Sequence, residues 1–144
     1  MIPKIEFEVY NQGDNPKAYD WCRNFIDKWQ KILNIQDWDI NLKFISGQKT
    51  TAEMGSSDYV AFCATEIHNK EATICMNIEH SKINDDIQTT LIHELMHIVM
   101  REWQLFTENA IEDEYAKEAC RLKMEQTIQS LAKAFCKVGG EVAE

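Results

Sequence analysis

The sequence has few of the residues that interrupt regular structure, with 5 glycines and 2 prolines among its 144 residues. A long flexible linker is therefore not expected, and no stretch reaches the roughly 18 to 20 apolar residues that span a membrane. Basic residues are also scarce, because 15 lysines and arginines stand against 24 acidic residues and leave a formal net charge of -9. This charge repels phosphate backbones and anionic lipid surfaces. We expect no nucleic-acid partner and no membrane partner.

The 5 cysteines are odd in number and lack CxxC spacing, which favours reduced, mostly buried thiols over disulfides or a zinc knuckle. The amino-terminal segment MIPKIEFEVYNQGDN differs from a signal peptide, which would have a basic start and a continuous apolar run. Both features favour a cytoplasmic protein. A chain of this length fits a single domain over residues 1–144 with its own hydrophobic core.

Alternation of apolar and polar residues predicts strands at 38–45 and 71–79, and a further strand is expected at about 58–67. The polar turn 68–70 would join the second and third strands as a hairpin. The segment 47–58 is the longest candidate loop. Together with the helical segments described next, these strands predict an α+β fold.

Apolar residues recur with helical spacing in three further regions. The first helix follows Pro16. A second helix is capped by Asn84, carries acidic residues in its first turn, where the helix dipole favours them, and should end at about Trp103. One or two helices then cover 108–136. The predicted order is one helix, three strands and two or three helices.

The segment LIHELMHIVM, residues 91–100, contains the motif HExxH at His93, Glu94 and His97. Residues four apart on an α-helix are neighbours about 5 to 6 Å apart at Cβ, so both imidazoles can reach one metal ion. Glu94 lies beside the first histidine and can hydrogen-bond a water molecule held by that ion. The spacing therefore predicts a zinc site.

The alternative interpretation is a pair of hydrogen-bonded structural histidines. The core-facing arc of this helix is supplied by other, apolar residues, and the histidines lie off that arc. The members of the arc are Ile87, Leu91, Leu95, Ile98, Val99 and Trp103. The placement of the histidines favours the metal site.

Catalytic zinc takes three protein ligands and an open position for water. A metzincin would have glycine and histidine at positions 100 and 103, which are Met100 and Trp103, so that class is excluded. The remaining candidates are carboxylates downstream. We favour Glu114 as third ligand, with Glu118 four residues later to accept a hydrogen bond from a histidine ring. A second pair with the same spacing is Glu108 and Glu112.

These residues resemble the gluzincins, zinc metallopeptidases in which the two histidines of HExxH are joined by a glutamate from a later helix in an ExxxD/E/N setting. The likeness covers about residues 20 to 135 and is closest to small, minimal metallopeptidases found in phage and prophage genomes. It rests on the segments TTLIHELMHIVM, ATICMNI and EYAKEACRL, the last of which is similar to the family's glutamate helix.

The resemblance implies a zincin-like fold. This fold would contain an N-terminal helix, a small, twisted, mainly antiparallel sheet, the HExxH helix and a C-terminal glutamate-bearing helix. The strand 71–78 would form the sheet edge above the cleft, where an extended peptide could add to it.

The expected activity is that of a zinc metallopeptidase acting on a peptide or protein substrate. Zn2+ on His93, His97 and Glu114 would lower the pKa of its water to about 7, and Glu94 would act as general base and then general acid. The oxyanion needs one further donor. The candidates for it are Tyr59, His68, His80 and Tyr115. The alternative function is a catalytically silent zinc-bearing binding or regulatory module of the same fold.

Overall fold

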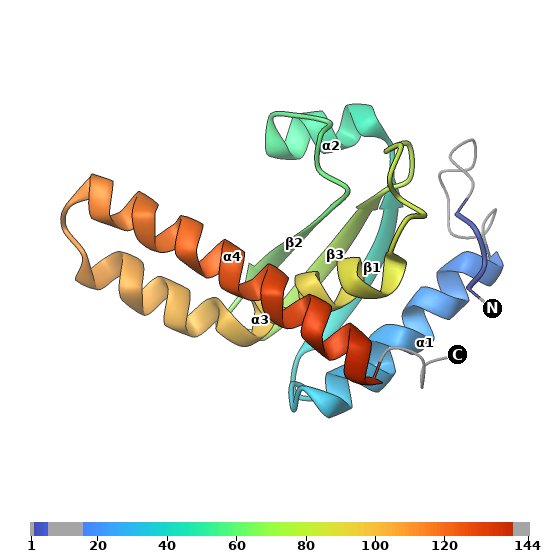
Figure 1. The fold of residues 1–144 in the computed structure, drawn as a ribbon, viewed down its shortest axis with the longest axis horizontal. Coiled ribbons are helices and arrows are strands. Elements are labelled where there is room, and N and C mark those ends of the chain that lie inside the picture. The colour runs from blue at the N-terminus through green and yellow to red at the C-terminus, as the bar shows by residue number, and fades with distance from the viewer. Residues whose placement is uncertain (1, 6–15, 140–144) are drawn as a thin grey trace.

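The computed structural model describes residues 2–5 and 16–139. Within these ranges it has an α+β fold with four helices and three strands (Figure 1). In chain order the elements are α1 (Pro16–Ile32), β1 (Asp39–Ile45), α2 (Gly47–Met54), β2 (Ala61–Glu66), β3 (Glu71–Asn77), α3 (Ile87–Ala110) and α4 (Glu114–Gly139). The prediction of an α+β fold is confirmed. None of the helices in the described ranges combines the length and the apolar character that crossing a membrane requires.

The strands form one mixed sheet in the order β1-β3-β2. β2 and β3 form the predicted antiparallel hairpin, whereas β1 and β3 are parallel. The expectation of a mainly antiparallel sheet is therefore wrong, and so is the placement of 71–78 at the sheet edge. β3 is buried along both faces and β2 is exposed at alternate positions. A strand that is apolar on both faces belongs in the centre of a sheet, and β2 forms the edge instead.

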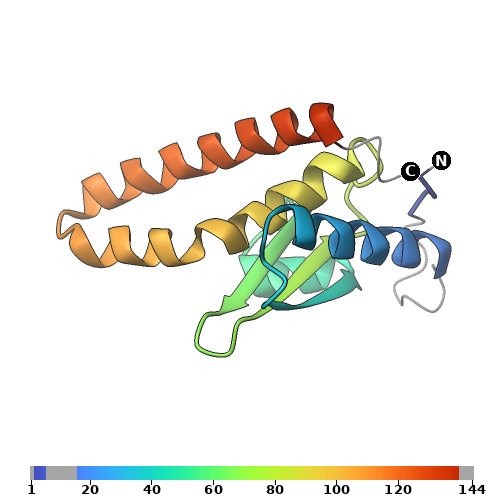
Figure 2. The same ribbon diagram turned by 90° about the horizontal axis from the view of Figure 1, so that it is seen from below.

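One face of the sheet carries the main hydrophobic core. The register aligns Ile40 of β1 with Ala72 of β3, and Leu42 with Ile74, so these side chains share a face. α1 and α3 pack in the same core cluster, and Figure 2 shows both helices on one side of the sheet, with α4 lying on α3. The helix predicted after Pro16 is confirmed as α1.

The segment predicted to be the longest loop contains a helix, α2. The Ser46 hydroxyl accepts a hydrogen bond from the backbone N–H of Lys49 and caps the first turn. Gly55 ends the helix in the left-handed conformation, with φ of 80°. The segment 47–54 is polar and has only weak helical periodicity, which is why it was predicted to be a loop. The two capping residues stabilise the helix in spite of this composition.

α3 begins and ends later than predicted. The Asp86 carboxylate caps the helix by accepting from the Thr89 N–H, whereas the Asn84 side chain forms two hydrogen bonds with the backbone of Ile5. α3 continues past Trp103 to Ala110, and α4 returns antiparallel to it as a helical hairpin that extends beyond the sheet (Figures 1 and 2). Trp103 is exposed there because no strand lies beneath it.

Candidate metal centre

The two histidines of HExxH lie on the half of α3 that is packed against the sheet. Leu91, Ile92 and Leu95, which surround them in the sequence, are completely buried and fix the rotation of the helix. His93 and His97 are directed toward α4 and are half-buried. Their ring centroids are 5.0 Å apart and their Nε2 atoms are 3.3 Å apart. The helix predicted for the motif is confirmed, and both imidazoles converge on one point.

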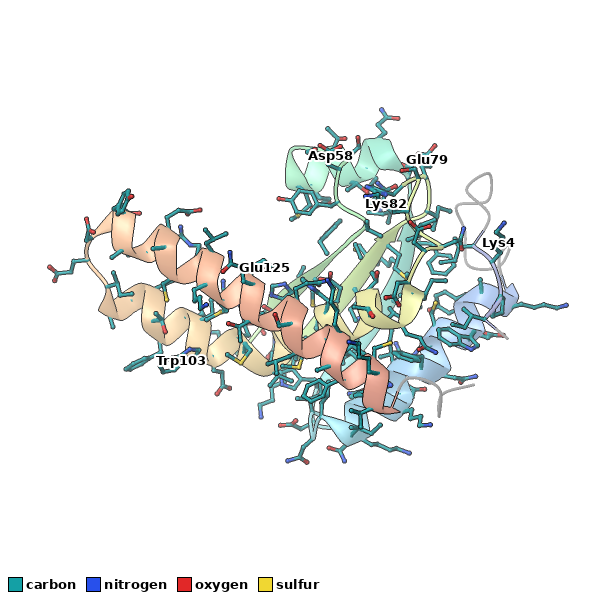
Figure 3. The ribbon with its side chains drawn as sticks, viewed as in Figure 1. Lys4, Asp58, Glu79, Lys82, Trp103 and Glu125 are labelled. Atoms are coloured by element: carbon teal, nitrogen blue, oxygen red, sulfur yellow. The ribbon has the colours of Figure 1, made fainter. Side chains whose placement is uncertain are left out.

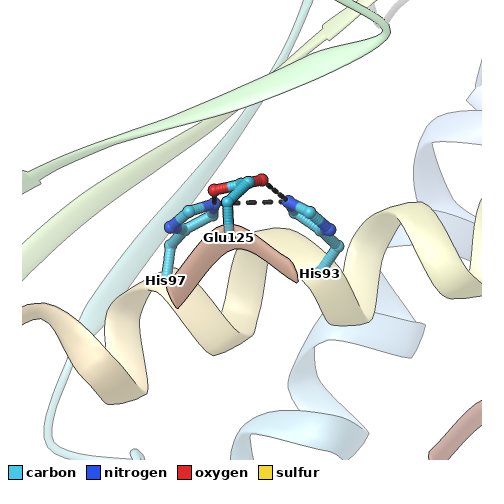
Figure 4. A group of neighbouring side chains, drawn as sticks. All are labelled: His93, His97 and Glu125. Atoms are coloured by element: carbon cyan, nitrogen blue, oxygen red, sulfur yellow. Dashed lines mark hydrogen bonds and ion pairs between the residues drawn. The ribbon is translucent and has the colours of Figure 1, made fainter. Parts of the chain in front are cut away.

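Glu125 of α4 completes this group. Its two carboxylate oxygens contact the two rings, with Oε1 2.7 Å from Nε2 of His93 and Oε2 3.3 Å from Nε2 of His97. Figure 4 shows the carboxylate lying across the pair. One atom from each of the three residues lies within 4.8 Å of the others, which is the arrangement that a metal ion can share.

The spacing of these atoms fits a tetrahedral zinc site. Metal–ligand bonds of about 2.0 to 2.1 Å place tetrahedral ligand atoms about 3.3 to 3.4 Å apart. The distance between the histidine Nε2 atoms and that from His97 Nε2 to Glu125 Oε2, both 3.3 Å, match this value. The distance from His93 Nε2 to Oε1 is shorter because these two atoms are hydrogen-bonded to each other. Two nitrogens and a carboxylate are also ligands that zinc prefers.

Gln129 of α4 holds the ring of His93 from its other side. The Nδ1–H of His93 donates to Oε1 of Gln129, at a distance of 2.6 Å. A proton on Nδ1 leaves the lone pair of the neutral ring on Nε2, which is the atom that faces Glu125 and His97. Glu125 and Gln129 are four residues apart, so one face of α4 supplies both a candidate ligand and the group that orients His93.

The structure does not bring Glu114 to the histidines, and the carboxylate that lies beside them is that of Glu125 instead. Glu114 begins α4, its side chain is 80% exposed, and it pairs with Lys117. It lies eleven residues before Glu125, which is about 16 Å along a helix. Glu118 pairs with Arg121, so the predicted hydrogen bond to a histidine is also wrong.

The second pair with the same spacing, Glu108 and Glu112, is also distant from the ligand group. Glu108 of α3 pairs with Arg121, and Glu112 is exposed in the turn between α3 and α4. The arrangement expected of a ligand and a supporting acceptor four residues apart does occur in α4, but it is made by Glu125 and Gln129.

The signal for Glu125 in the sequence is its spacing to Gln129, in the segment EQTIQ. An amide oxygen accepts a hydrogen bond as a carboxylate does. Pairs of acids at this spacing do not include Glu125. The apolar residues at the start of α4 indicate a buried face near Tyr115, but this side chain is 85% exposed. The buried residues of α4 are Ile128 and Ala132, and these decide which turn of the helix meets α3.

The ion pairs within the group shift its protonation. Hydrogen bonds from both histidines hold the pKa of Glu125 far below its ordinary value. For His93, burial is the largest single effect and lowers the pKa, but the hydrogen bond to Glu125, the charge of Glu94 and the hydrogen bond to Gln129 outweigh it, and the net shift is upward. Without a metal ion, the carboxylate and the imidazolium therefore stabilise each other.

Glu94 lies beside the ligand group and is only 6% exposed. Burial raises its pKa, while the charges of His93 and His97 act in the opposite direction. Its side chain lines the same cavity as both histidines and Glu125. Among the described residues, no hydrogen bond occupies its carboxylate. A buried carboxyl group with a raised pKa is suited to accept and return a proton near neutral pH.

A cavity of about 740 Å³ opens over this group between β2, α3 and α4. Its strand wall is made by Ala61, Cys63 and Thr65, which point toward α3, and by their neighbours on β2. Of the candidate donors for an oxyanion, Tyr59 lines the cavity. Tyr115 is exposed at the far end of the helical hairpin. His68 is exposed in the turn between β2 and β3, and His80 is bound to the backbone oxygen of Asp58.

Comparison of the chain with family models, with curated proteins and with solved structures finds no match.

Proposed function

We propose that the protein is a zinc-dependent metallopeptidase with a zincin-like fold, which binds Zn2+ through His93, His97 and Glu125 and hydrolyses peptide bonds. The observation that carries the proposal is the convergence of these three ligands beside a buried, unpaired Glu94 in an open cavity. A structural zinc site is closed by a fourth protein ligand, whereas a catalytic site keeps one position for water. A group of three candidate ligands among the described residues supports a catalytic site.

The chemistry follows from the position of Glu94. Zinc bound at this site would polarise a water molecule and lower its pKa to about 7. The Glu94 carboxylate would take a proton from a water molecule as its oxygen attacks the carbonyl carbon of the peptide, and would then deliver the proton to the leaving amine. Burial keeps bulk water away from this carboxylate and holds it in one place. Tyr59 lies at the cavity wall, where its hydroxyl can donate to the developing oxyanion.

The strand wall of the cavity fits an extended peptide. Within the described residues, β2 pairs with β3 along one edge and with no strand along the other. Five consecutive residues of β2, 61–65, line the cavity. An extended chain bound to the free edge through main-chain hydrogen bonds would run past Glu94 and the ligand group. This mode of binding depends on the backbone, so it accepts many sequences.

The experiment combines metal analysis with hydrolysis. Purified protein loaded with Zn2+ should contain about one equivalent and should cleave an unfolded protein such as reduced casein. Glu94→Gln should keep the zinc and lose at least about 100-fold in rate, which is the lower range for removing a general base. Glu102→Gln, an exposed acid on the same helix, is the matched control and should keep both properties.

The same experiment separates the peptidase from the alternative predicted from the sequence, a zinc-bearing binding or regulatory module. Such a module would bind zinc in all three proteins and hydrolyse nothing in any of them. Failure of the wild-type protein to bind zinc would reject both functions. Equal hydrolysis by the wild type and Glu94→Gln would reject the role of Glu94.

A further inference from the structure

Arg101 is a second polar group in the cavity that the proposed chemistry does not use. It lies on α3 one turn after His97 and lines the same cavity as His97 and Glu94. Its Nε atom is buried and has no hydrogen-bond partner. Over residues 2–5 and 16–139, its guanidinium forms no hydrogen bond and no ion pair. A group with five N–H donors and a fixed charge is thus left without an acceptor.

The other two arginines of the chain are held by the protein. Arg23 donates to the backbone oxygen of Ile40 and pairs with Asp27. Arg121, which also lines the cavity, pairs with Glu108 and Glu118. Leaving a buried donor without a hydrogen-bond partner is unfavourable. The contrast indicates that Arg101 is kept available for an acceptor that comes from outside the chain.

Arg101 lines the same cavity as the strand on which we place the substrate. Burial is the main reason that the pKa of Cys63 is raised, and the charges of Glu94 and Arg101 also act on this thiol, in opposite directions. Cys63 faces α3 from the middle of β2. Cys63, Glu94 and Arg101 all line the same cavity, so a peptide bound along β2 would pass both the general base and the guanidinium.

The distance along α3 between His97 and Arg101 determines which part of a bound peptide Arg101 could contact. One turn of four residues rises about 6 Å, and an extended peptide advances about 3.3 Å per residue. A peptide group that contacts Arg101 while the carbonyl is at the ligand group is therefore within about two residues of the cleaved bond. A guanidinium binds a carboxylate through two parallel hydrogen bonds, more strongly than it binds a neutral acceptor.

We infer that Arg101 is a specificity-determining residue that binds a carboxylate of the substrate within two residues of the cleaved bond. The carboxylate is that of an aspartate or glutamate side chain or that of the peptide C-terminus. The inference rests on the proposed peptidase function, which it refines by naming the substrate class.

The test uses zinc-loaded protein and a synthetic peptide library with randomised positions, prepared once with free and once with amidated C-termini, with products identified by mass spectrometry. The wild type should cleave sites next to Asp or Glu on the order of 10- to 100-fold faster than the same sites with Asn or Gln. If the C-terminus is the group that is bound, amidation should remove the preference instead.

Three variants assign this preference to Arg101. Arg101→Gln should lose it through a higher KM with little change in kcat on neutral peptides, and Arg101→Lys should restore part of it, because lysine keeps the charge but lacks the two parallel donors. Arg121→Gln is the matched control, since Arg121 lines the cavity but is already paired, and it should keep the preference.

Binding without turnover separates the inference from the proposed function. The inactive Glu94→Gln protein is titrated with the preferred acidic peptide and with its amide counterpart. Tighter binding of the acidic peptide that is lost in Glu94→Gln/Arg101→Gln supports the inference even if no variant hydrolyses peptides. Hydrolysis without any acidic preference, or a preference unchanged in Arg101→Gln, overturns the inference and leaves the peptidase function standing.

Discussion

The side-chain oxygen of Gln129 lies 2.6 Å from Nδ1 of His93. Glu125, one helical turn earlier on α4, contacts Nε2 of the same ring. Residues of α4 thus hold both nitrogens of one imidazole. The ligand geometry depends on the register of α4 against α3 as much as on the HExxH motif. Four predictions follow from this dependence.

Glu125→Gln should weaken zinc binding by more than about 100-fold, because loss of a ligand exceeds the 10- to 100-fold effect typical of a group that supports a ligand. Glu114→Gln should bind zinc as the wild type does, since Glu114 is exposed and paired with Lys117. Competition with a chelator of known zinc affinity measures both. Loss of zinc from Glu114→Gln but not from Glu125→Gln would contradict the ligand set.

Gln129→Ala should weaken zinc binding by about 10- to 100-fold, because the ring of His93 is then free to rotate and to place its proton on Nε2. Gln129→Glu keeps an acceptor for the Nδ1–H and should retain most of the affinity. The readout is the zinc dissociation constant of each variant, with Gln126→Ala, an exposed change on the same helix, as control. Equal affinities of Gln129→Ala and the control would remove the supporting role of Gln129.

The stability of the metal-free protein should depend on pH through Glu125 and His93. The pKa of Glu125 is lowered from 4.5, so its contribution is present above that value and is lost as the pH falls toward the folded pKa. The pKa of His93 is raised from 6.5, so its contribution is present below that value and is lost as the pH rises through the folded pKa.

Both contributions are complete between about pH 4.5 and 6.5. The free energy of unfolding of chelator-treated wild type should therefore exceed that of Glu125→Gln most clearly at pH 5.5, and the difference should shrink at pH 3 and at pH 8. Urea titrations at the three pH values measure it. A difference that is constant with pH would show that the pair does not contribute to folding.

Ile128→Ala should destabilise the protein by about 2 to 5 kcal/mol, because the side chain is completely buried and its loss leaves a cavity. Leu122→Ala, on the exposed part of the same helix, should change stability by less than about 0.5 kcal/mol. Because the buried Ile128 side chain fixes the turn of α4 that carries Glu125, Ile128→Ala should also bind zinc more weakly. Thermal unfolding with and without zinc tests both effects.

The part of the site that the sequence predicts is the HExxH motif, because helical geometry alone sets the relative positions of its residues. His93, Glu94 and His97 lie within five residues of one helix, so their relative positions follow from helical spacing. Their neighbours also show which side of α3 is buried, since Ile87, Leu91 and Leu95 are in the core. The residue patterns also identified all three strands and the hairpin of β2 and β3.

The position of Glu125 beside the histidines could not be predicted in the same way, because it depends on the packing of two helices. The apolar residues near the start of α4 suggested a buried face there, but Tyr115 and Leu122 are exposed since the helical hairpin extends past the sheet. Figure 3 places Trp103 on the outer side of this hairpin, away from Glu125. An apolar pattern in the sequence does not show which of its residues pack against another element. The central position of β3 was missed for the same reason, because it depends on the pairing of β3 with the distant strand β1.

The chain between the ligands runs from His97 to the end of α3, turns at 111–113, and returns along α4 to Glu125. An ion bound by residues of both helices would link α3 and α4 near the sheet. Without it, the two helices are joined by the turn at 111–113, and the buried residues of α4 are Ile128 and Ala132. The supply of zinc in the surroundings would then govern how often α4 detaches. When zinc is scarce, α4 would be the first segment of the described chain to become accessible to proteases.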